Sequence, residues 1–368
     1  GLKAHDPNNI SSEEEIANYC FSEQYINGLI NLIKDKISPP FSLSIDGNWG
    51  TGKTHLLKIL ERKLKEEHYP TIWFNPWEYE KTNSAYLAFI NKVSISFRDR
   101  FKISFKTLGI FGLALAVSSI DSTARFISNN SISYSNIKNI SKDVSKATKS
   151  EAANYKDTIQ EIKRDFVKIT RQITTSKEFN GKPIIIFLDD LDRCLPKNAL
   201  ELLEALKNTF NVKDSTAIFI CGQNVDITRG FINSEYPSID VKYASNYLKK
   251  IFDYSIKMPG VTKEQMKTFI GSRITEVFGS LDYELTNIIQ EFNEEVDNRS
   301  LRVIDKIISG YFFYNSVIEE KSLDIKFVIF WLFFKEIWPE TYNIVLGEIM
   351  KETNQMFGYI QKLMHGNA

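Results

Sequence analysis

A short glycine-rich segment of the sequence has the composition of a loop that binds phosphate groups. It fits the pattern G-x-x-x-x-G-K-[ST], with the residues Gly47, Asn48, Trp49, Gly50, Thr51, Gly52, Lys53 and Thr54. Glycine adopts positive φ angles freely, so such a loop can aim successive backbone N–H groups at a phosphate. The lysine adds charge for the β- and γ-phosphates, and the threonine offers a hydroxyl to Mg²⁺. The segment therefore predicts a nucleoside triphosphate site, with a glycine-rich turn that fits the pattern by chance as the alternative.

The flanks of this loop favour the phosphate-binding interpretation. Residues 41–46 indicate a strand before the loop, and apolar residues at helical spacing indicate a helix over 54–66. The positive N-terminal end of that helix would face the phosphates. His55, in the first turn of this helix, completes the predicted nucleotide-binding set.

A pair of aspartates follows an apolar run later in the chain. The five bulky apolar residues at 184–188 are typical of a central parallel strand covered on both faces, and Asp189 and Asp190 follow them directly. We predict that Asp189 binds Mg²⁺ through water and that Asp190 orients or deprotonates the attacking water. Aspartates after an apolar run are a weak signal alone, since they often begin loops or cap helices. Paired with the loop at 47–54, they predict magnesium-dependent triphosphate hydrolysis.

Two further polar residues are candidates for the site. Gln223, at the end of a predicted strand, could contact phosphate or the attacking water, or make only a strand-end hydrogen bond. Arg193 could stabilise transition-state charge in its own chain or in a neighbour's site, or form a salt bridge to Asp192 or a helix carboxylate. The segment from Gln223 to Asp226 lacks the Asn-Lys pair of guanine-selective loops, so ATP is expected rather than GTP.

The elements that must position these residues alternate along the chain. Strands are predicted near 41–46, 70–75, 183–188, 216–222 and 253–258, with helical patterns between them. This alternation predicts an α/β fold whose parallel sheet has helices on both faces and phosphates at the carboxyl ends of its strands. Four parts are predicted: an N-terminal helix with the first half of the NTPase core at 1–100, an insert at 101–150, the second half of the core at 151–260, and a C-terminal helical region at 261–368.

The insert follows from the long separation of the second and third predicted strands. It contains an uncharged apolar run at 108–117 and then a Ser-, Asn- and Lys-rich stretch at 131–150. Even when extended to residue 120, the run is shorter than the roughly 18 to 20 residues that cross a bilayer. A soluble apolar hairpin, a membrane-surface segment and a true span remain open. The apolar segment 327–334 is likewise either a buried central helix or a partner surface.

The composition of the 368 residues is consistent with a folded intracellular enzyme. Lysine plus arginine, 46, equals aspartate plus glutamate, 46, so no global basic field indicates nucleic-acid binding. The three cysteines lack metal-ligand spacing and fit a reducing compartment, and no secretory signal opens the sequence. We expect a cytoplasmic protein, with membrane contact through 108–120 as an alternative.

Several segments resemble the KAP family of P-loop NTPases. Asp189–Pro196 is similar to that family's "DDLDRC-x-P" stretch, and Trp73–Tyr79 resembles its "WFNxWxY" strand end. Tyr247–Phe252 with Met258 and Pro259 resembles its "YLEKIF…LP" segment. Arg299–Arg302 resembles its "PR-x-hK" helix start, although Asn298 replaces the usual proline. The resemblance runs from about residue 12 to about residue 310.

The resemblance implies a P-loop NTPase that binds and hydrolyses ATP with Mg²⁺ and couples turnover to conformational change or assembly. KAP proteins usually have aspartate where this chain has Gln223, so a phosphate-sensing role transfers poorly to it. Members often carry membrane-spanning segments at the position of the insert, and bacterial members often serve in defence against phage. A protein partner or further copies of the chain are expected, and no nucleic acid. The alternatives are a slowly hydrolysing, nucleotide-switched scaffold and a membrane-associated interaction protein.

Overall fold

The computed structural model describes residues 21, 23–80, 85–101, 151–237, 241–298, 300–317 and 323–365. The apolar run and the linker of the predicted insert lie outside these residues. The chain divides into two compact units. One contains Ser22–Trp49 and Lys53–Pro259, and the other contains Gly50–Gly52 and the residues from Gly260 onward.

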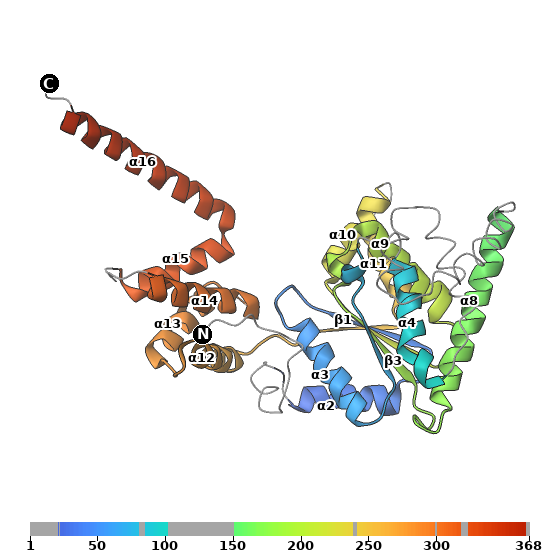
Figure 1. Cartoon of the computed structure of the whole chain (residues 1–368). Helices are drawn as coiled ribbons and strands as arrows, with labels where there is room; N and C mark the ends of the chain where they lie inside the picture. The colour runs from blue at the N-terminus through green and yellow to red at the C-terminus, as the bar shows by residue number, and fades with distance from the viewer. Residues whose placement is uncertain are drawn as a thin grey trace. The chain divides into compact units, whose positions relative to one another are not determined.

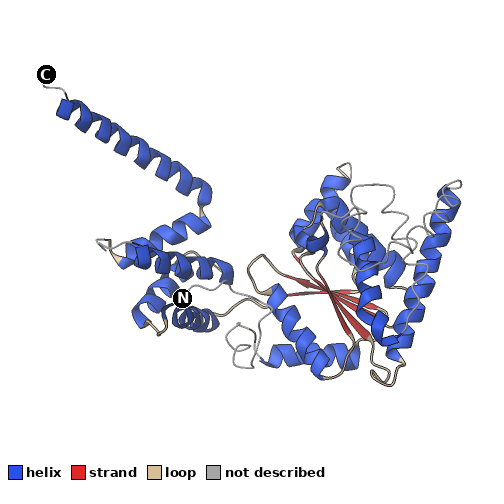
Figure 2. Ribbon diagram, in the orientation of Figure 1, coloured by secondary structure: helices blue, strands red, loops and turns tan. Residues whose placement is uncertain are grey.

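The first unit is built on a five-stranded parallel sheet (Figures 1 and 2). Its strands are β1 (Phe41–Asp46), β2 (Thr71–Phe74), β3 (Ile184–Leu188), β4 (Ala217–Gln223) and β5 (Tyr254–Lys257). They lie in the order β2-β3-β4-β1-β5, and every neighbouring pair is parallel. The predicted α/β fold with a parallel sheet is therefore confirmed.

Helices cover both faces of this sheet, as Figure 2 shows. Before β1 the chain forms α2 (Glu23–Asn31) and η1 (Leu32–Lys36). Between the strands it forms α3 (Lys53–Glu66), η2 (Pro76–Tyr79), α4 (Ala85–Phe101), α8 (Glu151–Thr174), η3 (Leu191–Arg193), α9 (Pro196–Ala205), η4 (Leu206–Phe210), α10 (Val225–Glu235) and α11 (Val241–Ile251). Two of them, α2 and α3, pack together. The larger core lies on the face covered by α4, α8, α9, α10 and α11.

The central strand β3 shows why both faces must be covered. All of its five residues are buried. Side chains of a strand alternate between its two faces, and Ile184, Ile186 and Leu188 join the larger core. Ile185 and Phe187 point to the opposite face and are also fully buried. The sequence of β3 is apolar at every position because helices cover both faces of the sheet at this strand.

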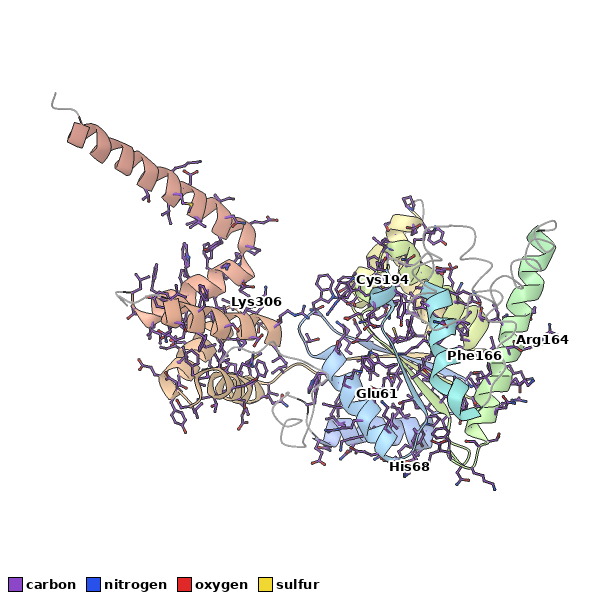
Figure 3. All side chains as sticks on the ribbon, in the orientation of Figure 1. Glu61, His68, Arg164, Phe166, Cys194 and Lys306 are labelled. Atoms are coloured by element: carbon purple, nitrogen blue, oxygen red, sulfur yellow. The ribbon has the colours of Figure 1, made fainter. Side chains whose placement is uncertain are left out.

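The helix α8 presents its apolar side to the sheet. In Figure 3, Phe166 points toward the sheet and Arg164 points away from it. The Phe166 ring lies 4.9 Å from that of Phe210 and 6.4 Å from that of Phe219, measured between centroids. These aromatic contacts fix α8 and the strand β4 against each other.

The second unit is helical, in agreement with the predicted C-terminal helical region. It comprises α12 (Lys263–Phe278), α13 (Tyr283–Glu295), α14 (Leu301–Val317), α15 (Ile325–Ile337) and α16 (Pro339–His365). A capping box at Thr262 begins α12, and Gly279, with φ of 84°, ends it. The apolar segment 327–334 lies in α15 and is only partly buried. Val328, Ile329 and Phe333 are buried, whereas Phe327 and Phe330 are exposed.

Among the described residues, no helix is long and apolar enough to cross a membrane. The segment 108–120, for which membrane contact was the alternative, lies outside the residues that the structure describes.

The packing of the sheet predicts a large effect of shortening a core side chain. Leu43 of β1 is 1% exposed, so we expect Leu43→Ala to lower the free energy of unfolding by about 2–5 kcal/mol through lost burial and a cavity. Leu195 lies in the same unit and is 60% exposed, so Leu195→Ala should change it by less than about 0.5 kcal/mol. Urea denaturation followed by circular dichroism measures both. Equal losses for the two variants would contradict the assigned core.

Candidate functional site

Polar residues gather where the parallel strands end. Gly47 follows β1, Asn75 follows β2, Asp189 follows β3, and Asn224 follows β4. Because the carboxyl ends of parallel strands meet at one edge of a sheet, these residues lie at the edge where such folds bind ligands. The edge joins the predicted phosphate loop to the predicted carboxylates.

The backbone of the predicted phosphate loop has the conformation that its glycines suggest. Gly50 and Gly52 adopt φ angles of 80° and 93°, which other residues reach only with strain. The N–H of Gly47 donates to the carbonyl of Gln223 at 3.1 Å, so the loop starts against the end of β4. Lys53 begins α3, and His55 is buried in the first turn of that helix.

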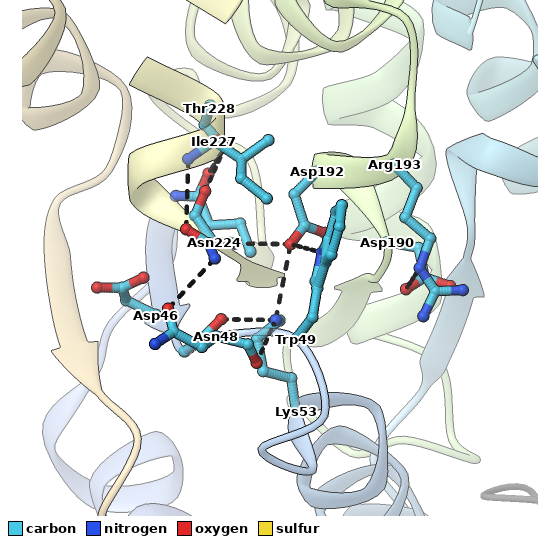
Figure 4. Close-up of polar contacts among 12 residues, drawn as sticks. Asp46, Asn48, Trp49, Lys53, Asp190, Asp192, Arg193, Asn224, Ile227 and Thr228 are labelled. Carbon is cyan, nitrogen blue, oxygen red and sulfur yellow. Dashed lines mark hydrogen bonds and ion pairs between the residues drawn. The ribbon is translucent and has the colours of Figure 1, made fainter. Parts of the chain in front are cut away.

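The ammonium of Lys53 is held at the centre of this edge (Figure 4). Its Nζ donates to the carbonyls of Gly47 at 2.6 Å and Asn48 at 3.2 Å, and lies 3.6 Å from Oδ2 of Asp192. Burial lowers the pKa of Lys53, and the nearby carboxylates of Asp192 and Asp189 oppose that shift. A cation is thus fixed inside a loop of backbone groups, which suits the binding of phosphate oxygens.

Asp189 has the environment of a cation ligand. It is 1% exposed, it shares a hydrogen bond with Thr54, and its Oδ1 has no hydrogen-bond partner among the described residues. Burial, followed by the neighbouring charge of Asp190, raises its pKa to about 6. A buried carboxylate oxygen without a donor, next to a threonine hydroxyl, fits Mg²⁺, which takes few protein ligands and completes its shell with water and phosphate. No group of three or more histidine, cysteine, aspartate or glutamate side chains that could hold a metal ion occurs in the described part of the chain.

Asp190 is held from both sides. Its backbone is in the left-handed region, with φ of 58°. Asn75 Nδ2 donates to Oδ2 at 3.1 Å, and Arg193 Nε lies 3.0 Å from Oδ1. Burial raises the pKa of Asp190, and the charge of Arg193 opposes that shift. The guanidinium of Arg193 also lies over the ring of Trp77, 5.4 Å from its centroid.

The same-chain salt bridge considered for Arg193 is therefore present, but its partner differs from the one named. The sequence suggested Asp192 or a helix carboxylate, and the structure places the guanidinium on Asp190. Asp192 turns inward instead and meets the phosphate loop, as Figure 4 shows. Asp190 is the N-cap of the one-turn helix η3, and Asp192 lies within it. Their spacing in the sequence therefore does not decide which of the two carboxylates meets Arg193.

Gln223 makes the strand-end hydrogen bonds that were one of its two predicted roles. Its side chain is fully buried; Nε2 donates to Ser44 Oγ at 2.9 Å, and Oε1 accepts from Thr228 Oγ1 at 2.9 Å. Both ends of the amide are thus used between β1, β4 and α10. This geometry favours the structural role of Gln223 over contact with phosphate.

Two asparagines at the site were not assigned a role from the sequence. Asn75 bonds Asp190, as described above. Asn224 caps α10 by accepting from the N–H groups of Asp226 and Ile227, and its Nδ2 donates to Asn48 Oδ1 at 3.3 Å. An asparagine at a strand end directly before a helix is a capping signal, and it could have placed Asn224 at this edge.

The buried carboxylate of Asp189 predicts a dependence of stability on pH. Its folded pKa of about 6 lies above the ordinary value of about 4. The free energy of unfolding of wild type, minus that of Asp189→Asn, should therefore be largest below about pH 4. This difference should fall by about 2–3 kcal/mol as the pH rises from about 4 through about 6. Chemical denaturation without Mg²⁺ at several pH values measures this. Asp226→Asn, at an exposed position, is the control. A difference that stays constant across this pH range would show that burial does not raise the pKa of Asp189.

The sequence model of the KAP family P-loop domain matches residues 22–310. An uncharacterized protein of Methanocaldococcus jannaschii is 33% identical over 70 residues, which cover 19% of this chain. The match spans 34% of that relative's length.

Two solved structures show a distant likeness. Domain III of the Thermotoga maritima replication initiation protein DnaA is 14% identical with a TM-score of 0.39, and the match covers 87% of this chain and 94% of that one. The Aeropyrum pernix ORC1 protein, solved in complex with DNA, is 13% identical with a TM-score of 0.41, and the match covers 88% of this chain and 65% of that one. The family match spans the loop, the sheet and the paired aspartates, and the chain therefore belongs to the KAP family of P-loop NTPases.

Proposed function

We propose that this protein is an ATPase that hydrolyses ATP in the presence of Mg²⁺ at the edge formed by β1, β3 and β4. The observation that carries the proposal is the contact of Asp189, the first of the paired aspartates, with the phosphate loop. Asp189 bonds Thr54 of the loop, and Asp190 follows it at the strand end. The second carboxylate is a candidate to orient or deprotonate the attacking water, which hydrolysis requires.

The phosphate loop and Asp189 would contribute differently to the binding of Mg-ATP. Lys53, whose ammonium now contacts the carbonyls of Gly47 and Asn48, would neutralise charge on the phosphates. Thr54 and Asp189 would hold Mg²⁺, which supplies further positive charge at the phosphate oxygens when it is bound. The N-terminus of α3 adds the positive end of the helix dipole.

Asp190 is suited to act on water. Asn75 and Arg193 each occupy one of its two oxygens, and a carboxylate has about four acceptor positions. Acceptor positions therefore remain for a water molecule while the side chain stays fixed. A raised pKa, caused mainly by burial, makes the carboxylate a better proton acceptor than an exposed aspartate.

A slowly hydrolysing nucleotide-switched scaffold is the second candidate. Burial of the satisfied amide of Gln223 favours it in one respect, because that side chain is not oriented toward phosphate. The fixed position of Asp190 favours turnover. We expect turnover to drive conformational change or assembly with a protein partner or further copies of the chain, as the family membership suggests. The family membership also suggests a role in defence against phage.

Binding and turnover should separate between two variants. Lys53→Ala should weaken ATP binding by roughly a hundredfold or more, because the phosphates lose a charge-assisted donor. Asp190→Asn should keep binding and lower the turnover number by roughly 10²-fold or more, because an amide cannot take the proton from water. Calorimetric titration with Mg-ATP and phosphate release measure the two effects.

Lys65→Ala is the matched control, since Lys65 is on the exposed side of the same helix. Turnover by Asp190→Asn at the wild-type rate would remove Asp190 from the catalytic role. Absence of nucleotide binding in wild type would overturn the proposal as a whole.

The position of Arg193 predicts that it acts within its own chain. Because its guanidinium pairs with Asp190 of the same chain, a mixture of Lys53→Ala chains and Arg193→Ala chains should recover no ATPase activity. Activity per chain of the wild type should also be independent of protein concentration. Recovery in the mixture would instead indicate an arginine that reaches a neighbour's site, an effect worth on the order of 10³ or more in rate.

A further inference from the structure

Asp192 is neither the proposed metal ligand nor the proposed base, yet its buried carboxylate contacts both the phosphate loop and the end of β4. It is 2% exposed and lies in η3, beyond the paired aspartates. One oxygen, Oδ2, accepts from Trp49 Nε1 at 2.9 Å and from the backbone N–H of Asn224 at 3.0 Å. The same oxygen lies 3.6 Å from Lys53 Nζ. Figure 4 shows these three contacts converging on one side chain.

The contacts join segments that are distant in sequence. Trp49 and Lys53 belong to the phosphate loop, and Asn224 joins β4 to α10. Asn224 also contacts the loop through its side chain, which donates to Asn48. A shift of Asp192 would therefore displace the loop relative to the end of β4.

The two chemical properties of Asp192 have different consequences. Its acceptor oxygen fixes Trp49 and Asn224 in place, whereas its negative charge attracts the ammonium of Lys53. A bound phosphate would compete with the carboxylate of Asp192 for the ammonium of Lys53, because both groups are negatively charged and would contact the same buried cation. The second oxygen, Oδ1, is buried and has no hydrogen-bond partner among the described residues, so the protein does little to neutralise the carboxylate on that side.

We infer that Asp192 is a positioning residue that fixes the phosphate loop to the end of β4 through Oδ2 and restrains Lys53 by its charge. The acceptor oxygen strengthens nucleotide binding because it holds the loop in its binding conformation. The negative charge weakens nucleotide binding because the ion pair between Asp192 and Lys53 must break before Lys53 can contact a phosphate. This inference deepens the proposed function, and its affinity measurements rest on that function.

Two isosteric substitutions separate the two effects. Asp192→Asn removes the charge and keeps one acceptor oxygen for Trp49 and Asn224. Asp192→Leu removes both. Titration with Mg-ADP should give a dissociation constant at least about threefold lower for Asp192→Asn than for wild type. The constant for Asp192→Leu should be at least about tenfold higher than for Asp192→Asn, because a buried N–H loses its acceptor.

Equal dissociation constants for the asparagine and leucine variants would overturn the positioning role. A constant for Asp192→Asn equal to or above that of wild type would overturn the role of the charge.

The indole resonance of Trp49 tests the contact without nucleotide. Its Nε1–H signal, identified by its loss in Trp49→Phe, should keep the shift of a hydrogen-bonded indole in Asp192→Asn and move in Asp192→Leu. An unchanged signal in Asp192→Leu would overturn the inference even if nucleotide binds as proposed. If wild type binds no nucleotide, the proposed function fails, and this signal alone decides whether Asp192 positions the loop.

Trp49→Phe also serves if Asp192→Leu does not fold, because it removes the donor and leaves the buried carboxylate in place. It should weaken Mg-ADP binding by about fivefold. Trp338→Phe is the matched control, since Trp338 is 45% exposed against 50% for Trp49 and lies in the helical unit. Equal binding by Trp49→Phe and the control would contradict the inference.

Discussion

The burial of negative charge at the end of β3 constrains the whole site. Asp189, Asp190 and Asp192 lie within four residues of one another and are largely or fully removed from water. An uncompensated buried carboxylate is costly, so each of the three requires a cation or several donors nearby. Lys53 approaches Asp192, Arg193 pairs with Asp190, and Asp189 keeps an oxygen without a protein donor. Asp189 and Asp192 each keep one buried oxygen without a hydrogen-bond partner among the described residues, and we propose Asp189 as the metal ligand because it bonds Thr54 of the phosphate loop.

The parallel sheet explains how these groups reach one place. The register pairs Asp46 of β1 with Gln223 of β4, and Leu188 of β3 with Cys221 of β4. The chain therefore leaves β1, β3 and β4 at nearly the same level, and the phosphate loop, the aspartates and the start of α10 follow there. The continuous apolar sequence of β3 is what keeps this edge rigid, because its side chains are buried on both faces.

Much of this could be predicted from the sequence because it depends on local patterns. The glycines and Lys53 fix a loop conformation, and the five apolar residues of β3 predict both the central strand and the position of Asp189. The partners of Arg193 and Gln223 could not be predicted in this way. They depend on which way η3 turns after β3 and on the pairing of β4 with β1, which places Ser44 beside the amide of Gln223. Asn75 could not be placed in this way, because its contact with Asp190 depends on the ends of β2 and β3 lying together. Asn224 has a local capping signal, but its contact with Asn48 depends on the pairing of β4 with β1.

The most direct test of a nucleotide site at this edge is a crystal structure of the protein with Mg²⁺ and a slowly hydrolysed ATP analogue. We expect the triphosphate within the loop at 47–54, with Lys53 Nζ moved from the carbonyls of Gly47 and Asn48 to phosphate oxygens and Asp189 facing the metal ion. A nucleotide bound elsewhere, or Lys53 still bonded to those carbonyls beside a bound triphosphate, would contradict it.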